Sequence, residues 1–156
     1  MPALDERLTK SRILQEVKSM NRVRKCGVLA PTVYLCDVAE RKIFMEYLGD
    51  ETRTLKDFIR GLGGNMSHPV MPALAAKIAE NLANLHKGDN IHGDLTTSNM
   101  MLKPKGWQGG YGIEKVEPPS VEETAQHLQT GNASLDLMDF GLSFVSSKIE
   151  DKATDI

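Results

Sequence analysis

Two long segments of the chain carry apolar side chains at helical spacing. Residues 9–25 present one every three to four positions and stop before Gly27, so we predict a helix that ends at this glycine. A second helix is predicted over residues 72–86, where a proline stands at the start. Its apolar positions are Leu74, Ile78, Leu82 and Leu85. A short helix is predicted over residues 54–60, between these two segments.

Shorter apolar runs predict strands. Residues 31–38 and 42–47 indicate two strands joined by a turn at 39–41. Further short strands are expected at residue 91, at 100–102 and at 135–138. This mixture of helices and strands predicts an α+β fold.

The composition of the 156-residue chain is that of a globular protein with a single core. A formal net charge of −2 provides no overall attraction to nucleic acid or to a membrane. The first thirty residues hold seven Lys or Arg and three acidic residues, which we interpret as a solvated helix face rather than a nucleic-acid patch. No apolar run is long enough for a transmembrane helix, and no signal peptide opens the chain. Cys26 and Cys36 lack zinc-site spacing, so we expect reduced thiols in a cytoplasmic or nuclear protein.

Two short motifs carry the chemistry of the chain. His92-Gly93-Asp94-Leu95-Thr96-Thr97-Ser98-Asn99 has the H-x-D-x-x-x-x-N spacing of a kinase catalytic loop. Asp139-Phe140-Gly141 is the D-F-G sequence of a kinase metal site. Their order and their apolar flanks favour phosphoryl transfer from a nucleotide over the alternative, in which both runs are ordinary turns.

The charge of a transferring phosphoryl group explains why these residue types are needed. We expect Asp94 to orient the attacking hydroxyl or water and to accept its proton. We expect Asp139 to hold Mg²⁺, which prefers carboxylate oxygens, and the amide of Asn99 to bind the metal as well.

The catalytic loop also resembles a particular kinase family. The strings IHGDLTTSNMMLKP (91–104) and DFGLSF (139–144) resemble the PRPK family, the atypical kinase/ATPase subunit of the KEOPS (EKC) complex. The resemblance extends to residues 4–9, 12–16 and 150–153 and covers nearly all of the chain except about 104–134. Thr96-Thr97-Ser98, at the variable positions of the motif, distinguish the PRPK family, because aminoglycoside and choline kinases share only H-G-D-L-x-x-x-N.

The resemblance implies a nucleotide site for ATP and Mg²⁺. Residues 44–48 resemble a kinase hinge, in which the Glu46 carbonyl and the Leu48 amide would hold adenine. Glu16 stands where the family has the helix glutamate that pairs with the phosphate lysine. Gly93 replaces the arginine of H-R-D, which argues against control by activation-loop phosphorylation.

The expected fold is α+β and protein-kinase-like, without the first N-lobe strands and the end of the C-lobe. No glycine-rich loop or lysine-bearing strand precedes Glu16, so the chain looks like a truncated family member. We expect residues 1–48 to be the remnant of the N-lobe and hinge. Residues 49–156 would be a partial C-lobe with a flexible insertion at about 104–134, because residues 106–131 are rich in Gly, Pro and Glu.

The family function is ATP-dependent phosphoryl transfer, as an atypical serine/threonine kinase or ATPase, serving threonylcarbamoyladenosine modification of tRNA. The implied partners are the other KEOPS subunits, chiefly the threonylcarbamoyltransferase subunit, and protein substrates with Ser or Thr, with tRNA reached only through the complex. One alternative is a catalytically inactive binding subunit or fragment. Another is a small-molecule kinase of the aminoglycoside or choline type. We expect the isolated chain to have little activity, because the upper half of the phosphate site is missing.

Overall fold

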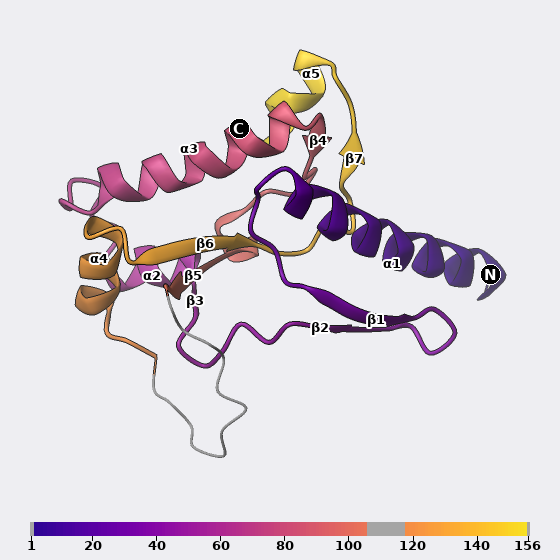
Figure 1. Ribbon diagram of the computed structural model, residues 1–156, viewed down its shortest axis with the longest axis horizontal. Helices are drawn as coiled ribbons and strands as arrows, with labels where there is room; N and C mark the ends of the chain where they lie inside the picture. The colour runs from indigo at the N-terminus through magenta and orange to yellow at the C-terminus, as the bar shows by residue number, and fades with distance from the viewer. Residues whose placement is uncertain (1, 106–117, 156) are drawn as a thin grey trace.

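The computed structural model describes residues 2–105 and 118–155, and the side chains from residue 7 onward. This part of the chain contains both helices and antiparallel strands (Figure 1), which confirms the predicted α+β class. A core of apolar side chains joins the C-terminal part of the first helix to the central sheet and the helices around it.

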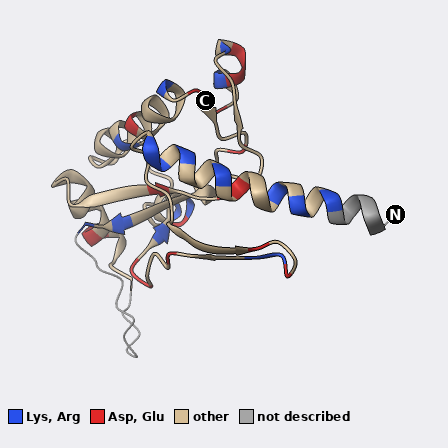
Figure 2. Ribbon diagram, turned by 45° about the vertical axis from the view of Figure 1, so that its right-hand side comes forward, with Lys and Arg blue, Asp and Glu red and all other residues tan. Residues whose placement is uncertain are grey.

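The first helix, α1 (Pro2–Lys25), is longer at its N-terminus than the predicted segment. Met20 and Val23 are buried, and Gly27 follows the helix with a φ of 84°, as expected of a glycine at a helix end. Lys and Arg residues recur along the ribbon of α1 (Figure 2), and Lys18 and Lys25 are exposed, which fits a solvated helix face.

Strands β1 (Val33–Asp37) and β2 (Lys42–Met45) form an antiparallel sheet of their own, as predicted. Figure 1 shows this hairpin beside α1 and set apart from the central sheet. Leu35 and Phe44 are register partners, and more than half of each side chain is exposed. The hairpin therefore leaves apolar surface uncovered, as expected of a sheet that lacks neighbouring strands.

The central sheet has the order β3-β5-β6 and is antiparallel. Its strands are β3 (Arg53–Thr54), β5 (Met100–Pro104) and β6 (Ala133–Leu137). Helix α2 (Leu55–Gly61) follows β3 directly, and the Thr54 hydroxyl caps it by accepting the N–H of Asp57. Helix α3 (Met71–Lys87) lies along β6 (Figure 1), where the Asn81 amide donates to the Leu135 carbonyl at 3.2 Å.

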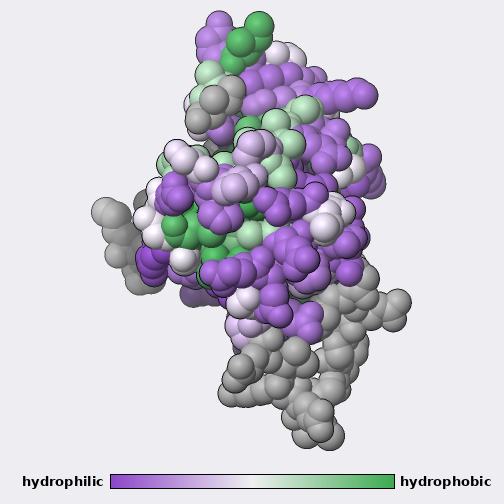
Figure 3. Space-filling model, turned by 90° about the vertical axis from the view of Figure 1, so that its left-hand side faces the viewer, coloured by the Kyte–Doolittle hydropathy of each residue, from purple (hydrophilic) through white to green (hydrophobic). Residues whose placement is uncertain are grey.

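A helix within residues 118–131 corrects one prediction. We expected residues 106–131 to be an irregular flexible insertion, but α4 spans Val121–Gln129 and packs against β6. Ser120 and Glu123 form a capping box at its start, and Ala125 and Leu128 are buried in the core. Residues 106–117 of the predicted insertion lie outside the described residues. The view onto α2, α4 and the start of α3 shows a mostly hydrophilic surface with several small apolar patches (Figure 3).

The remaining elements surround the two sequence motifs. Strands β4 (Asn90–Ile91) and β7 (Phe144–Val145) pair with each other, the first just before the catalytic loop and the second just after the D-F-G sequence. The 3₁₀ helix η1 (Thr97–Asn99) leads into β5. Helix α5 (Ile149–Lys152) and the 3₁₀ helix η2 (Ala153–Asp155) end the described chain next to the C-terminal end of α3. Within the described residues, none of the helices combines the length and apolar content that a membrane span requires.

Candidate active site

The backbone of the catalytic loop is anchored by a buried carboxylate. The two oxygens of Asp155 accept the backbone N–H of His92 at 2.8 Å and of Gly93 at 2.9 Å. The His86 ring also lies within hydrogen-bond distance of Asp155, with Nε2 3.1 Å from Oδ2. Because the carboxylate is buried, these bonds compensate its lost hydration and fix the loop immediately before Asp94.

The side chain of His92 has a structural role. Its side chain is fully buried, its Nε2 lies 2.9 Å from the Met138 carbonyl, and its ring contacts Phe140 with centroids 4.8 Å apart. Burial lowers the pKa of the imidazole and outweighs the Met138 contact and the nearby carboxylates. The neutral ring thus joins the catalytic loop to the D-F-G segment without carrying a charge at neutral pH.

Gly93 allows these two segments to approach closely. Its φ is 80°, and a Cβ at this position would lie 2.7 Å from the carbonyl oxygen of Leu142. A side chain here would therefore be strained in its backbone and would also collide with the segment after Gly141. This contact gives a physical reason for glycine where ordinary protein kinases have arginine.

The predicted catalytic residues lie on adjoining backbone segments. The N–H of Met138 donates to the Asn99 carbonyl at 2.9 Å, which places Asp139 next to the end of the catalytic loop. The Asn99 side chain closes that loop, because its Nδ2 donates to the Asp94 carbonyl at 3.0 Å. Asp94 and Asp139 are exposed to solvent, as groups that meet a substrate must be. Asp139 has a φ of 60°, a conformation that is uncommon outside glycine and often marks functional positions.

Asn99 and Asp139 suit a magnesium ion. In the assigned orientation, the Asn99 amide nitrogen is used inside the loop, so the amide oxygen is left as an acceptor. The Asp139 carboxylate is exposed on the neighbouring segment. No cluster of three His, Cys, Asp or Glu side chains occurs in the described part of the chain. A site with two protein ligands agrees with the preference of Mg²⁺ for few carboxylates completed by water and phosphate oxygens.

Glu16 faces the D-F-G segment from α1. Burial raises the pKa of this half-buried carboxyl, and the negative charge of Asp139 raises it further. The two carboxylates therefore repel each other, and a cation between them would relieve that repulsion. A second contact joins the same two segments, since the Gln15 side-chain amide donates to the Ser143 carbonyl at 2.6 Å.

The predicted hinge residues lie just after β2. Leu48 is buried, and within the described residues neither its N–H nor the Glu46 carbonyl has a hydrogen-bond partner. The Glu46 side chain is bonded to Thr32 and paired with Lys103 rather than with any catalytic residue. The structure therefore brings Glu16, Asp94, Asn99 and Asp139 into one region and leaves the contact of Glu46 and Leu48 with adenine as a prediction.

Two contacts of the site, made by Asp155 and by Gln15, are not predicted by any pattern in the sequence. Asp155 lies 62 to 63 positions from the loop that it holds, and Gln15 lies 128 positions from Ser143. No local spacing marks either residue. Only the motif itself, which needs a rigid backbone, indicates that such an anchor must exist.

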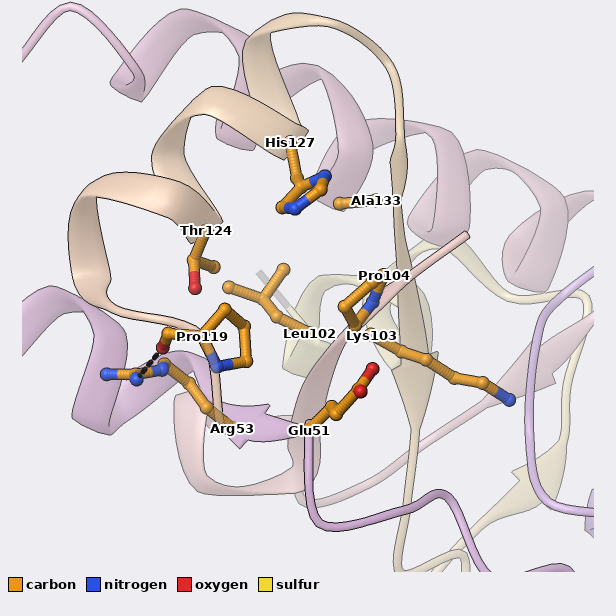
Figure 4. A pocket seen from close by; sticks show the side chains of 9 residues that line it. All are labelled: Glu51, Arg53, Leu102, Lys103, Pro104, Pro119, Thr124, His127 and Ala133. Carbon is orange, nitrogen blue, oxygen red and sulfur yellow. Dashed lines mark hydrogen bonds between the residues drawn. The ribbon is translucent and has the colours of Figure 1, made fainter. Parts of the chain in front are cut away.

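An enclosed pocket lies elsewhere in the molecule. Side chains of β3, β5 and α4 surround it (Figure 4), and the Arg53 side chain donates to the Pro119 carbonyl at its edge. Its free volume is about 10 Å³, hardly more than one water molecule needs, and none of the predicted catalytic residues lines it. This pocket is thus a packing feature of α4 rather than a nucleotide site.

Comparison with known proteins identifies a kinase family, as the catalytic-loop motif predicts. The family model described as "Protein tyrosine and serine/threonine kinase" matches residues 3–154. The chain belongs to this kinase family. A solved structure titled "WaaP in complex with acyl carrier protein" is similar in fold, with a TM-score of 0.60 over 90% of this chain and 54% of that chain, at 18% sequence identity. The predicted protein-kinase-like fold is confirmed.

Several of the similar curated proteins carry KEOPS names. The chain is 32% identical to the "EKC/KEOPS complex subunit bud32" of Dictyostelium discoideum, covering 99% of this chain and 51% of that protein. It is 35% identical to the "EKC/KEOPS complex subunit Tp53rkb" of Mus musculus, covering 99% and 54%. A "Probable bifunctional tRNA threonylcarbamoyladenosine biosynthesis protein" of Methanobrevibacter smithii is 33% identical over 98% of this chain and 21% of that protein. The predicted resemblance is confirmed, and the chain spans about half the length of the first two relatives.

Proposed function

We propose that this kinase-family chain carries the metal-binding and acceptor-binding half of a nucleotide site. We further propose that the protein to which this half belongs transfers phosphoryl groups from ATP to a serine or threonine hydroxyl or to water. The observation that carries the proposal is the 2.9 Å hydrogen bond from the Met138 N–H to the Asn99 carbonyl, because it joins the D-F-G segment to the catalytic loop. Asp94 and Asp139 are exposed on these two adjoining segments, and both carboxylates act electrostatically on His92.

Each residue has a distinct task in this proposal. The Asp94 carboxylate accepts the proton of the attacking hydroxyl or water and aligns its oxygen. Asn99 and Asp139 hold Mg²⁺, which supplies neutralising charge to the phosphates when it is bound. The Glu46 carbonyl and the Leu48 N–H, which have no partner within residues 2–105 and 118–155, provide an acceptor and a donor for the edge of adenine. Asp155 and His92 keep the loop rigid, so that Asp94 needs no reorganisation during the reaction.

The names of the relatives support a role in KEOPS. They are called EKC/KEOPS complex subunits or a tRNA threonylcarbamoyladenosine biosynthesis protein, so we propose that this protein serves that tRNA modification within the complex. Leu142, Phe144 and Val145 follow the D-F-G sequence and are exposed, with 54%, 39% and 55% of their surface accessible. Such adjacent apolar side chains are suited to a protein contact, and we propose that they dock on the threonylcarbamoyltransferase subunit.

Binding and turnover of ATP test the proposal together. Calorimetric titration of Mg·ATP and release of radiolabelled phosphate would be measured for the wild type, Asp94→Asn and Asp139→Asn. We expect Asp139→Asn to weaken Mg·ATP binding at least tenfold, whereas Asp94→Asn retains binding and loses turnover. Turnover by these 156 residues alone should be at least about a hundredfold below that of a kinase with a glycine-rich loop and a phosphate lysine, because each of those parts contributes charge-assisted hydrogen bonds of roughly 1.5–3 kcal/mol. An affinity for Mg·ATP that is unchanged in Asp139→Asn would overturn the proposal.

A further inference from the structure

The Glu46 side chain connects three separate segments of the chain. Its Oε2 accepts the backbone N–H of Thr32 at 3.1 Å and the Thr32 hydroxyl at 3.0 Å. Its Oε1 accepts the Lys103 ammonium at 3.4 Å. Thr32 immediately precedes β1 and Lys103 belongs to β5, so one carboxylate ties the hairpin and the central sheet to the residue that follows β2.

The backbone of Glu46 is also hydrogen bonded to Thr32. Its N–H donates to the Thr32 carbonyl at 2.7 Å, so Thr32 and Glu46 are joined by three hydrogen bonds, of which two end on the Glu46 carboxylate. Because the side chain and the backbone of Glu46 are bonded to the same residue, Thr32, the backbone of Glu46 has little freedom to rotate. The carbonyl of Glu46 and the N–H of Leu48 have no hydrogen-bond partner in the described chain. Both lie at or just after the residue that these bonds to Thr32 restrain.

Lys103 is the cation shared by two acids. Burial raises the pKa of Asp136 on β6, the positive charge of Lys103 lowers it, and the negative charge of Glu46 raises it again. For Glu46, burial raises the pKa, but the hydrogen bonds from Thr32 and the charge of Lys103 outweigh it, so the pKa lies below its usual value. Glu46 is therefore ionised at neutral pH, and its carboxylate competes with Asp136 for one ammonium group.

These contacts line an open depression of about 290 Å³, whose other residues include Arg24 and Lys105. Lys103 is mostly buried there, with 16% of its side chain exposed, whereas Lys105 is exposed. An ion pair in which one partner is so shielded is less weakened by water and salt than a pair on the open surface.

We propose that Glu46 is a positioning residue, whose carboxylate, held by Thr32 and Lys103, fixes the backbone of residues 46–48 in the conformation that receives adenine. The adenine part of this inference rests on the proposed function, whereas the fixing of the backbone does not. No reacting atom contacts Glu46, so its effect is on nucleotide affinity rather than on the chemical step.

Amide hydrogen exchange in the nucleotide-free chain tests directly whether the Glu46 side chain restrains the backbone. Glu46→Ala and Lys103→Met should speed exchange at the amides of residues 32 and 46 at least tenfold and leave the amides of β5 and β6 unchanged. Glu46→Gln keeps an oxygen acceptor for Thr32 and should give an intermediate effect. Lys105→Met is the matched control, because Lys105 lines the same depression without contacting Glu46. Unchanged exchange at residues 32 and 46, or equal acceleration throughout the sheet, would overturn the inference.

Ligand titration separates this inference from the proposed function. Adenosine should bind Glu46→Ala and Lys103→Met at least fivefold more weakly than the wild type and Lys105→Met, whereas Mg·tripolyphosphate should bind all four proteins equally. If adenosine binds none of them, the adenine site of the proposed function fails, and hydrogen exchange still decides whether Glu46 fixes the backbone. If the variants lose affinity for Mg·tripolyphosphate as well, the effect is not confined to residues 46–48 and the inference is wrong.

Discussion

The carboxylate of Asp155 accepts the backbone N–H of His92 at 2.8 Å, although the two residues are 63 positions apart. A second bond to the N–H of Gly93 and a contact with His86 make Asp155 the main anchor of the catalytic loop. The loop is thus fixed by a residue that the motif itself does not contain, and the strength of this anchor can be measured.

Asp155→Ala should destabilise the chain by about 3 kcal/mol or more. The substitution leaves two backbone N–H groups without their charged acceptor, and each such bond contributes roughly 1.5–3 kcal/mol. Urea unfolding followed by circular dichroism measures the change. Glu150→Gln is the control, because Glu150 is exposed and lies in the same terminal segment. A loss below about 0.5 kcal/mol, the range of ordinary surface substitutions, would contradict the anchoring role.

Gly93→Ala and Gly131→Ala should differ in cost, although both glycines have a positive φ. At Gly131, with a φ of 73°, nothing lies within 4 Å of an added Cβ, so only backbone strain of about 1 kcal/mol is expected. At Gly93 the same strain is joined by a collision with the Leu142 carbonyl at 2.7 Å. We expect Gly93→Ala to cost at least 1 kcal/mol more in free energy of unfolding. Equal costs for the two variants would show that the segment after Gly141 moves away freely.

Glu16→Gln should stabilise the chain at pH 7 and lose this advantage at low pH. The pKa of Glu16 in the folded chain lies above its ordinary value of 4.5, first because of burial and then because of Asp139. Ionised Glu16 therefore opposes folding once the pH is above the folded pKa. Below the unfolded pKa, the wild-type carboxyl is protonated in both states and the penalty disappears.

Unfolding free energies at pH 7 and pH 4 would show this change, with Glu80→Gln as the control, since Glu80 is exposed. A glutamine variant that is less stable than the wild type at pH 7 would mean that ionised Glu16 has a favourable partner.

Much of the fold could be predicted because its signals are local. The helix at residues 71–87 has a continuous apolar stripe, and the hairpin of β1 and β2 has two short strands around a tight turn. Helix α4 was missed although Ser120 and Glu123 form a capping box, because the surrounding Gly and Pro residues suggested an irregular loop.

The candidate site rests on local motifs in the same way, and the roles of its residues stay predictions. Asp94, Asn99 and Asp139 follow from motif spacing, and the structure places them on adjoining segments. The tasks of Asp155 and of the Glu46 side chain depend on contacts between distant segments. Tertiary packing creates those contacts, and no local pattern in the sequence marks them.

Leu35→Thr combined with Phe44→Thr should reduce self-association. The two side chains are register partners on the hairpin and are 58% and 51% exposed, so together they form an apolar patch on a two-stranded sheet. Threonine keeps strand propensity while removing most of the apolar surface. Light scattering during heating and size-exclusion chromatography measure the effect, and Met66→Thr is the control, because Met66 is 70% exposed and lies outside the hairpin. Equal aggregation of the double variant and the wild type would place the association surface elsewhere.

The central claim is that Asn99 and Asp139 hold the divalent cation of a bound nucleotide. Paramagnetic broadening of backbone NMR signals by Mn²⁺ in the presence of ATP tests it most directly, because Mn²⁺ takes the hard oxygen ligands that Mg²⁺ takes and broadens signals near its own position. We expect the signals of residues 94–99 and 139–141 to broaden first, and we expect Asp139→Asn, but not Asp151→Asn, to abolish this broadening. Broadening centred on other residues, or broadening at the catalytic loop that persists in Asp139→Asn, would contradict it.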